Sequence, residues 1–252
     1  MRRMQKGVST TSEASCPAAW CAEPMFDRIA PTYDLLNHLL SFGRDFSWRR
    51  KAARCIGAGG PLRVVDLATG TADLLIALLR EHPHIVDAVG LDCSEEMLAV
   101  GRDKLRKCRL AARARLVPGD ATRTTFADES FDVVTMAFGI RNTPDPQATL
   151  DEIHRLLAPG GAAVILEFSL PANAVLRWGY LVHLRLVVPL IGALVSGDRQ
   201  AYRYLNQSIE SFHGPAAFCA MMEQAGFHDV SAQPLTAGVA SIYKGSKAIG
   251  NG

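Results

Sequence analysis

Acidic and small residues follow two apolar segments in the first half of the chain. The segment 64–73 (VVDLATGTAD) is typical of a buried strand, a turn of small residues and the start of a helix. One helix length later, Val89-Gly90-Leu91-Asp92 is typical of a second strand that ends in an acid. In such a βαβ unit the small residues let the backbone approach a nucleoside, and the acid binds the ribose hydroxyls. The spacing therefore predicts a nucleoside site.

The turn also indicates which nucleoside binds. A dinucleotide-binding loop has a glycine where Asp73 stands, so that the helix packs closely and its N-terminus faces a pyrophosphate. A carboxylate at this position would repel a phosphate. We therefore expect an adenosine cofactor with a cationic tail, and S-adenosylmethionine, a sulfonium, fits that description. A nicotinamide-dependent dehydrogenase is the competing class, and Asp73 argues against it.

We expect the cofactor to be held by residues at the ends of three strands. Asp92 accepts hydrogen bonds from the ribose, because Ser94 already fills the alternative role of helix cap. Thr71 lies near the methionine part, and Asp66 orients the amino end, directly or through the loop amides. After the third strand, Asp120 accepts a hydrogen bond from the adenine amino group, and the backbone N–H of Ala121 donates to an acceptor of the adenine ring. The predicted cofactor-binding residues are Asp66, Gly70, Thr71, Asp92, Asp120 and Ala121.

The composition is that of a single globular domain. The 252 residues are 48% hydrophobic and 21% charged, and the net charge of +2 indicates no nucleic-acid-binding surface. Six cysteines lack the spacing of zinc ligands, so we expect no metal and reduced thiols in a cytoplasmic protein. Residues 1–24 have no apolar stretch of a secretory signal and are predicted to form a disordered or loosely docked tail, with a second tail at 246–252.

Strand and helix patterns alternate between the two tails. This alternation predicts one domain at 25–245, with a parallel sheet covered by helices on both faces. Two strand-like runs at the end have no helix between them, which predicts an antiparallel hairpin joined by Thr236-Ala237-Gly238. We expect Pro159-Gly160-Gly161 to end the third helix. The predicted strands are 62–68, 86–92, 114–118, 131–137, 162–168, 229–235 and 238–244. The predicted helices are 71–82, 94–107, 146–158 and 215–226.

Residues 174–195 are apolar enough to resemble a membrane span, but two arginines, His183 and Pro189 interrupt them. We therefore expect a helical insertion at 170–212 that covers an apolar pocket or lies on a membrane surface. Ordinary packing in the core is the alternative.

Several motifs together resemble the ubiquinone/menaquinone C-methyltransferase family of the UbiE/MenG type. The glycine loop is shared by many methyltransferases, whereas motifs outside the nucleoside core are far more specific. The likeness extends over about residues 25–245. Its motifs are FDRIAPTYDLLN (26–37), the loop at 66–73, GLD (90–92), GDA (119–121), FGIRN (138–142), LLAPGG (156–161), LEFS (166–169), and YRYL (202–205) followed by SI (208–209).

The resemblance implies an α/β, Rossmann-like class I S-adenosylmethionine-dependent methyltransferase. Such a fold has a seven-stranded sheet whose last strand is antiparallel, here with the helical insertion before the C-terminal hairpin. The resemblance also implies methylation of a ring carbon on a polyprenylated hydroquinone.

Three departures from the family pattern concern the loop and the quinone. Ala68 and Ala72 stand where many members have glycine, and alanine fits there if the backbone angles are ordinary. Ala137 stands where ubiquinone-type members often have serine, and residues 210–215 (ESFHGP) replace an arginine followed by Pro-x-Gln. The last two favour a naphthoquinone, so demethylmenaquinol is the expected substrate. The benzoquinol of ubiquinone biosynthesis, another apolar phenol and a non-catalytic quinone-binding protein are the alternatives.

The expected reaction needs a nucleophilic ring carbon. Loss of a phenolic proton pushes charge onto the ortho carbons, one of which attacks the sulfonium methyl group in line, so alignment and phenolate stabilisation set the rate. Arg141 follows the fourth strand, and we expect its donors to hold the phenolate or an activated water. Candidate proton acceptors are Asp34, Glu167 and His154, although His154 is also typical of a packing residue. The substrate pocket is predicted to contain Tyr33, Asp34, Asn142 and Tyr202.

A polyprenyl tail does not leave the bilayer unaided, because each buried CH₂ group contributes about 0.8 kcal/mol. We therefore expect peripheral contact with the inner face of the membrane through residues 174–195. In this hypothesis Arg177 and Arg185 meet anionic head groups. The residues expected to face lipid or the tail are Trp178, Tyr180, Leu181, Leu184 and Val188. The oligomeric state stays open, with a homodimer as one option.

Overall fold

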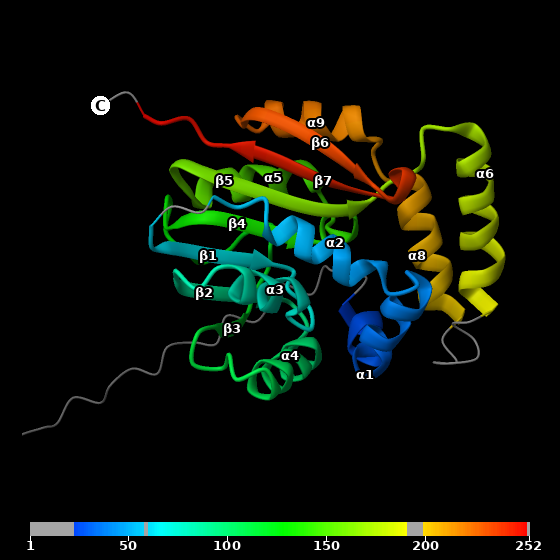
Figure 1. Cartoon of the computed structure of the whole chain (residues 1–252), viewed down its shortest axis with the longest axis horizontal. Coiled ribbons are helices and arrows are strands. Elements are labelled where there is room, and N and C mark those ends of the chain that lie inside the picture. The colour runs from blue at the N-terminus through cyan, green and yellow to red at the C-terminus, as the bar shows by residue number, and fades with distance from the viewer. Residues whose placement is uncertain (1–22, 58–59, 191–198, 251–252) are drawn as a thin grey trace, which may run out of the picture.

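The computed structural model describes residues 23–57, 60–190 and 199–250. Its centre is a seven-stranded sheet of order β3-β2-β1-β4-β5-β7-β6 (Figure 1). The first five strands are parallel, and β7 is antiparallel to both of its neighbours. The strands are β1 Leu62–Leu67, β2 Ile85–Asp92, β3 Arg115–Pro118, β4 Phe131–Ala137, β5 Leu157–Phe168, β6 His228–Leu235 and β7 Ala240–Ser246. The predicted fold class, including the C-terminal hairpin, is confirmed.

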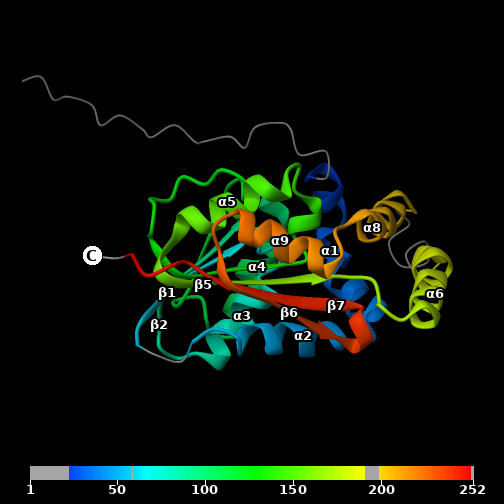
Figure 2. The ribbon, with the colours of Figure 1, turned by 90° about the horizontal axis from the view of Figure 1, so that it is seen from above.

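Helices cover both faces of the sheet, as Figure 2 shows with α2 and α3 on one side and α5 and α9 on the other. Neighbouring residues of β1 pack into the two layers, since Val64 belongs to the core with α2, α3 and α4, and Val65 to the core with α5 and α9. Strands buried on both faces carry such continuous apolar runs. The helices around the sheet are α1 Glu23–Leu40, α2 Arg44–Ala53, α3 Asp73–Glu81, α4 Glu95–Lys107, α5 Pro146–Leu156 and α9 Pro215–Gln224.

Side-chain caps fix where several helices begin. Ser94 accepts a hydrogen bond from the Met97 N–H at 3.1 Å at the start of α4. Asp145 accepts from the N–H groups of residues 147 and 148 at the start of α5, whose first residue is Pro146. Such caps satisfy N–H groups that have no partner inside the helix. The sequence signals for α4 and α5 are therefore strong ones.

Two turns differ from the prediction. Helix α5 ends at Leu156, so Pro159-Gly160-Gly161 lies inside β5, where the register with β4 shifts. The loop after β1 is longer than predicted, and α3 starts at Asp73 rather than at residue 71. Ala68 and Ala72 have φ values of 48° and 66°, so the condition of ordinary backbone angles, under which alanine would fit here without strain, is not met. Left-handed backbone costs a residue with a Cβ about 1–2 kcal/mol, and the surrounding hydrogen bonds must hold the loop in place.

Helices α1 and α2 are absent from the sequence prediction. Helix α2 is polar overall, and it docks on the sheet through Trp48, Ala52 and Ala53, each at most 3% exposed. A short helix with so few apolar residues gives a weak periodic signal. It nevertheless supplies one wall of the site described below.

A helical unit stands beyond the carboxyl ends of the strands (Figure 1). It comprises α6 Ala174–Val182, a π-helical turn His183–Val187, and α8 Arg199–Ser211. Arg185 forms an ion pair with Glu210 at 2.6 Å, which joins the π-helical turn to α8. Within the described residues, no helix has the length and apolar character needed to cross a bilayer.

The faces of this unit correct the predicted orientation. Trp178 points outward and is 69% exposed, whereas Leu184 and Val188 are buried on the inner side. Arg185 is paired with Glu210, and Arg177 donates to the carbonyl oxygen of Pro171, so neither guanidinium is fully available to a head group. The residues predicted to face lipid or the tail therefore lie on two different faces, one exposed and one buried.

The bend in β5 gives a stability prediction. A Cβ at Gly161 would lie 2.8 Å from the Ala158 carbonyl oxygen and 3.0 Å from that of Asp132. We expect Gly161→Ala to lower the free energy of unfolding by about 1–3 kcal/mol, as overpacking against rigid backbone does. The measurement is urea denaturation.

Gly179→Ala is the matched control. No atom lies within 4 Å of its Cβ, and the residue is inside α6. It should stabilise the protein by about 0.5–1 kcal/mol through helix propensity. Equal midpoints for Gly161→Ala and the wild type would contradict the assigned clash.

Candidate active site

Two hollows lie at the carboxyl edge of the sheet, and Phe138 lines both of them. The smaller hollow, of about 50 Å³, lies over the loop after β1. The larger, of about 410 Å³, lies between α2 and the helical unit of α6 and α8. Open α/β sheets bind their ligands at this edge.

Asp92 links the residues around the smaller hollow through its hydrogen bonds. Its Oδ2 accepts a hydrogen bond from the Gly70 N–H at 2.8 Å, and its Oδ1 accepts from the Ser94 N–H at 3.0 Å. The residue is 9% exposed, and burial raises the pKa of its carboxyl. Gly70 has a φ of 54°, which brings its N–H towards the acid. The predicted ribose acid and Gly70 thus line one pocket.

Asp66 lies beneath the same loop. Its carboxylate accepts from the Thr69 hydroxyl at 2.6 Å and from the Thr135 hydroxyl at 2.7 Å. The side chain is 1% exposed, and burial raises the pKa of Asp66 to about 6. Both oxygens are occupied, so this geometry favours the predicted action through the loop over direct contact.

The smaller hollow fits an adenosine cofactor with a cationic end. Asp92 is the charged residue of its lining, which has no lysine or arginine to bind a phosphate. Asn142 contributes a buried Oδ1 that has no hydrogen-bond partner in the described structure, and such an acceptor suits an ammonium donor. Phe26 and Met97 supply apolar surface for an adenine ring. The donor set agrees with S-adenosylmethionine.

The charge of Asp73 is not free to repel a phosphate, contrary to what the sequence had suggested. Asp73 forms an ion pair with Lys104, so its charge is compensated and does not by itself exclude a phosphate. Lys104 Nζ also donates to Asp34 Oδ2 at 2.9 Å and to the Thr71 hydroxyl at 3.1 Å. The smaller hollow nevertheless disfavours phosphates, because its lining residues are uncharged except for the acidic Asp92.

These contacts anchor α1 over the cofactor loop. The Thr71 hydroxyl donates to Asp34 at 2.5 Å, and the Ser94 hydroxyl donates to Asp27 at the same distance. Asp34, predicted in the substrate pocket, is therefore engaged by Lys104 and Thr71 and does not line the larger hollow. Its role as a proton acceptor stays a prediction.

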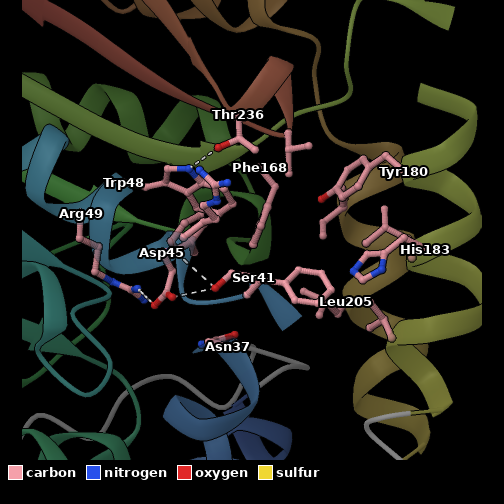
Figure 3. Close-up of a pocket in the computed structure, with 17 residues that line it drawn as sticks. Asn37, Ser41, Asp45, Trp48, Arg49, Phe168, Tyr180, His183, Leu205 and Thr236 are labelled. Carbon is pink, nitrogen blue, oxygen red and sulfur yellow. Dashed lines mark hydrogen bonds and ion pairs between the residues drawn. The ribbon is translucent and has the colours of Figure 1, made fainter. Parts of the chain in front are cut away.

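The larger hollow is mostly apolar, and Figure 3 shows its walls. Trp48 forms one side and donates its indole N–H to the Thr236 hydroxyl at 2.9 Å. Phe138, directly after β4, and Phe168, at the end of β5, also line it, with ring centroids 4.5 Å apart. The helical unit contributes Tyr180, His183, Leu184, Val188, Leu205 and Ile209.

One polar cluster interrupts this apolar wall. Asp45 is 2% exposed and accepts hydrogen bonds from the Ser41 hydroxyl (2.7 Å), from His38 Nδ1 (2.7 Å) and from Arg49 Nη1 (2.5 Å). Burial favours the neutral acid, but these three partners outweigh it and hold the pKa of Asp45 below its usual value. The cluster was not predicted, because its one signal in the sequence is a tryptophan between charged residues at 44–51.

Arg141 lies behind the wall of the larger hollow. Its Nη1 donates to Glu167 at 2.7 Å and to the Phe138 carbonyl oxygen at 2.7 Å, and its guanidinium stacks 5.2 Å from the Phe168 ring centroid. Glu167 is fully buried, and burial raises the pKa of its carboxyl despite the Arg141 charge. The catalytic role of Arg141 stays a prediction.

The other predicted site residues are dispersed. Tyr33 and Asn142 line the cofactor hollow, and the Tyr202 side chain lies outside the described residues. Asp120 accepts from the Thr122 N–H and hydroxyl, and its neighbour Ala121 is buried, so their adenine contacts stay predictions. His154, which lies in α5, packs edge-on against Phe227, as expected of a packing residue. The described residues contain no cluster able to hold a metal.

Fold and cofactor hollow together define a class I S-adenosylmethionine-dependent methyltransferase. Solved structures share the fold: the [4+2]-cyclase SpnF has a TM-score of 0.69 at 16% identity, with 95% of this chain and all of that chain covered. For the Haemonchus contortus phosphoethanolamine N-methyltransferase 2 in complex with S-adenosyl-L-methionine, the TM-score is 0.57 at 17% identity, and 79% of this chain and 52% of that one are covered.

The chain belongs to the ubiE/COQ5 methyltransferase family, whose sequence profile matches residues 18–247. A relative named demethylmenaquinone methyltransferase from Thermus thermophilus is 45% identical over 88% of this chain and 100% of its own length. The ubiquinone/menaquinone biosynthesis C-methyltransferase UbiE of Geobacter sulfurreducens is 44% identical, over 89% of this chain and 88% of the relative. The resemblance drawn from the motifs is confirmed, and S-adenosylmethionine is the cofactor.

Asp92 provides the test of the cofactor site. We expect Asp92→Ala to weaken S-adenosylmethionine binding about a hundredfold or more, because two hydrogen bonds to a charged group, about 1.5–3 kcal/mol each, are lost. Isothermal titration measures the affinity. Asp87→Ala is the control, since Asp87 is on the same strand and half-exposed. Unchanged affinity in a folded Asp92→Ala variant would remove the ribose assignment.

Asp66 gives a pH prediction. The native state holds the Asp66 proton more tightly than the unfolded chain, because the pKa is raised from 3.8 to about 6. The stability that this provides is therefore present below about pH 4 and lost as the pH rises to about 6. Unfolding free energies of Asp66→Asn minus wild type should rise over this range by about 3 kcal/mol and then level off.

Urea denaturation at a series of pH values measures this difference. Asp103→Asn is the control, because Asp103 lies on the surface with Arg106. A pH-independent difference for Asp66→Asn would contradict the raised pKa.

Proposed function

We propose that the protein methylates a ring carbon of a polyprenylated hydroquinone and converts demethylmenaquinol to menaquinol. The observation that carries the proposal is the apolar hollow of about 410 Å³ beside the cofactor hollow, with Phe138 shared between them. Its volume is within the range of about 300–1,000 Å³ usual for small-molecule sites. The printed names of the curated relatives support the same reaction class.

The apolar walls orient a flat ring. Trp48, Phe138 and Phe168 are mutually in contact, with centroid separations of 4.5–6.3 Å. An aromatic substrate stacked on these rings would present one edge towards the cofactor hollow. When bound, S-adenosylmethionine supplies an electrophilic methyl group. The chain then contributes alignment, exclusion of water and stabilisation of the phenolate.

A naphthoquinol is favoured over a benzoquinol. Ala137, at the end of β4, lines the cofactor hollow and offers no hydroxyl to a ring substituent. Residues 210–215 differ from the ubiquinone-type pattern, and Glu210 of this segment pairs with Arg185. The benzoquinol of ubiquinone biosynthesis is the second candidate, because relatives named for both pathways match the chain equally well.

Mass spectrometry of quinones tests the proposal. A bacterial host without its own methyltransferase, complemented with this chain, should convert demethylmenaquinone to a product heavier by one methylene group. Asp92→Ala is the inactive control. Accumulation of methylated benzoquinones alone would assign the second candidate, and no methylated quinone of either kind would indicate a non-catalytic quinone-binding protein.

We further propose peripheral contact with a lipid bilayer through the outer face of α6 and the π-helical turn. Large apolar side chains on this face are mostly exposed, among them Val175 (76%), Trp178 (69%) and Leu186 (67%). The inner face of the same helices lines the larger hollow through Tyr180 and Leu184. A tail that remains in the bilayer could therefore reach the ring site across one helix.

Liposome flotation tests this contact. We expect Trp178→Ser/Leu186→Ser to reduce partitioning onto anionic vesicles at least tenfold, because each buried side chain contributes about 1.5–3 kcal/mol. Val86→Ser/Ile249→Ser is the matched control, since both residues are exposed apolar side chains elsewhere on the surface. Equal flotation of the three proteins, or none by the wild type, would remove this surface as the membrane contact.

A further inference from the structure

The larger hollow contains a buried cation that the sequence did not reveal. Arg49 lines this hollow and is 6% exposed, while its neighbour Arg50 on the same helix is exposed. Isolated charges are rarely buried unless they are paired or serve a ligand. Arg49 is paired, but only in part, as its contacts show.

Asp45 holds Arg49 by a single nitrogen. Arg49 Nη1 donates to Asp45 Oδ2 at 2.5 Å, and the hydrogen bonds of the described residues engage no other nitrogen of this guanidinium. The same carboxylate is fixed by Ser41 and His38, so the anchor is rigid. A guanidinium has five N–H donors, and those not directed at Asp45 are available to a ligand in the hollow.

The position of Arg49 relates it to the reacting centre. Its guanidinium carbon lies 5.2 Å from the centroid of the Phe138 ring, and Phe138 lines both the larger hollow and the smaller, cofactor hollow. The Arg49 charge also acts on Tyr33 and on Asp66 at the cofactor loop. A cation here stands beside the place where substrate and cofactor meet.

We propose that Arg49, oriented by Asp45, donates to the reacting hydroxyl oxygen of the hydroquinone and stabilises its phenolate. The inference rests on the proposed function. It assigns to Arg49 the electrostatic role that the sequence suggested for Arg141. Arg49 lines the larger hollow, whereas Arg141 is not among its lining residues. Arg141 Nη1 donates to Glu167 and to the Phe138 carbonyl oxygen beside the ring of Phe168, and its buried Nε has no hydrogen-bond partner in the described structure.

Other groups that face the hollow do not duplicate this role. Tyr180 lines it from α6, and burial raises the pKa of its hydroxyl, so it stays neutral. His183 faces the hollow from the π-helical turn, with its ring tilted against that of Phe42, and Arg44 lies on α2 with an exposed side chain. Asp45 is the anion beside Arg49, and its low pKa keeps it charged over the working range.

The test is the pH dependence of kcat with demethylmenaquinol in mixed micelles at saturating S-adenosylmethionine. Arg49→Gln should lower kcat about 10²–10³-fold, as loss of an oxyanion donor does. The ascending limb of its kcat profile should move to higher pH, because a less stabilised phenolate needs a higher pH to form. Affinity for S-adenosylmethionine, measured by titration, should stay close to that of the wild type.

Two further variants separate charge from folding. Arg49→Lys keeps the charge without the planar fork, so it should be intermediate in kcat and retain most of the wild-type pH profile. Arg50→Gln, on the exposed face of α2, should match the wild type. If Arg49 had only a structural role, Arg49→Gln would change thermal stability without shifting the ascending limb of the kcat profile.

Wild-type kcat and an unshifted limb in Arg49→Gln would overturn the inference while leaving the methyltransferase reaction in place. A shifted limb in Arg141→Gln with none in Arg49→Gln would return the role to Arg141. If the wild type does not methylate any hydroquinone, the proposed function fails and this inference with it.

Discussion

Two carboxylates are buried at the ends of neighbouring parallel strands, and the described residues provide neither with a direct ion pair. Asp66 and Asp92 are at most 9% exposed and depend on N–H and O–H donors from Thr69, Gly70, Ser94 and Thr135. An unsatisfied buried charge is far more costly than backbone strain. The loop after β1 therefore adopts left-handed angles that place its donors on the acids. The cofactor hollow is the surface that this arrangement leaves exposed.

The second hollow follows from the same edge of the sheet. Phe138, directly after β4, also has a positive φ, of 57°, and its ring closes the cofactor hollow on one side and the apolar hollow on the other. Strain of this kind persists when surrounding contacts determine the geometry, and it concentrates at functional sites. Arg141 holds the Phe138 carbonyl oxygen, and Arg49 stacks over the ring. Phe138, which lines both hollows, is thus fixed at its carbonyl oxygen and at its ring.

Burial on one face and exposure on the other explain the unusual sequence of the helical unit. Residues 174–190 carry apolar side chains all round, which a helix packed at the surface of a globular domain does not. Their inner side lines the larger hollow, and their outer side leaves Trp178 and Leu186 exposed. The fold thus places the apolar hollow directly behind an exposed apolar surface.

Local patterns in the sequence were sufficient for the sheet, the C-terminal hairpin and the position of the cofactor loop, but not for the left-handed angles of that loop. Buried parallel strands have continuous apolar runs, caps such as Ser94 lie within a few residues of their partners, and Asp92 is placed by strand length alone. The sequence thus determined the class of fold, the nucleoside site and, through its motifs, the family. Tertiary structure decided everything that joins distant segments.

Lys104 meets Asp34 across 70 positions of the chain, and Trp48 meets Thr236 across 188. Asp45 and Arg49 are only four residues apart, yet nothing local indicates that their helix is buried against the site. The sequence of helix α2 is polar overall, and only its packing against α1, α3 and β5 buries Asp45 and Arg49. Burial is a property of the assembled chain, so the environment that gives Arg49 its chemistry could not be predicted from residue type and spacing.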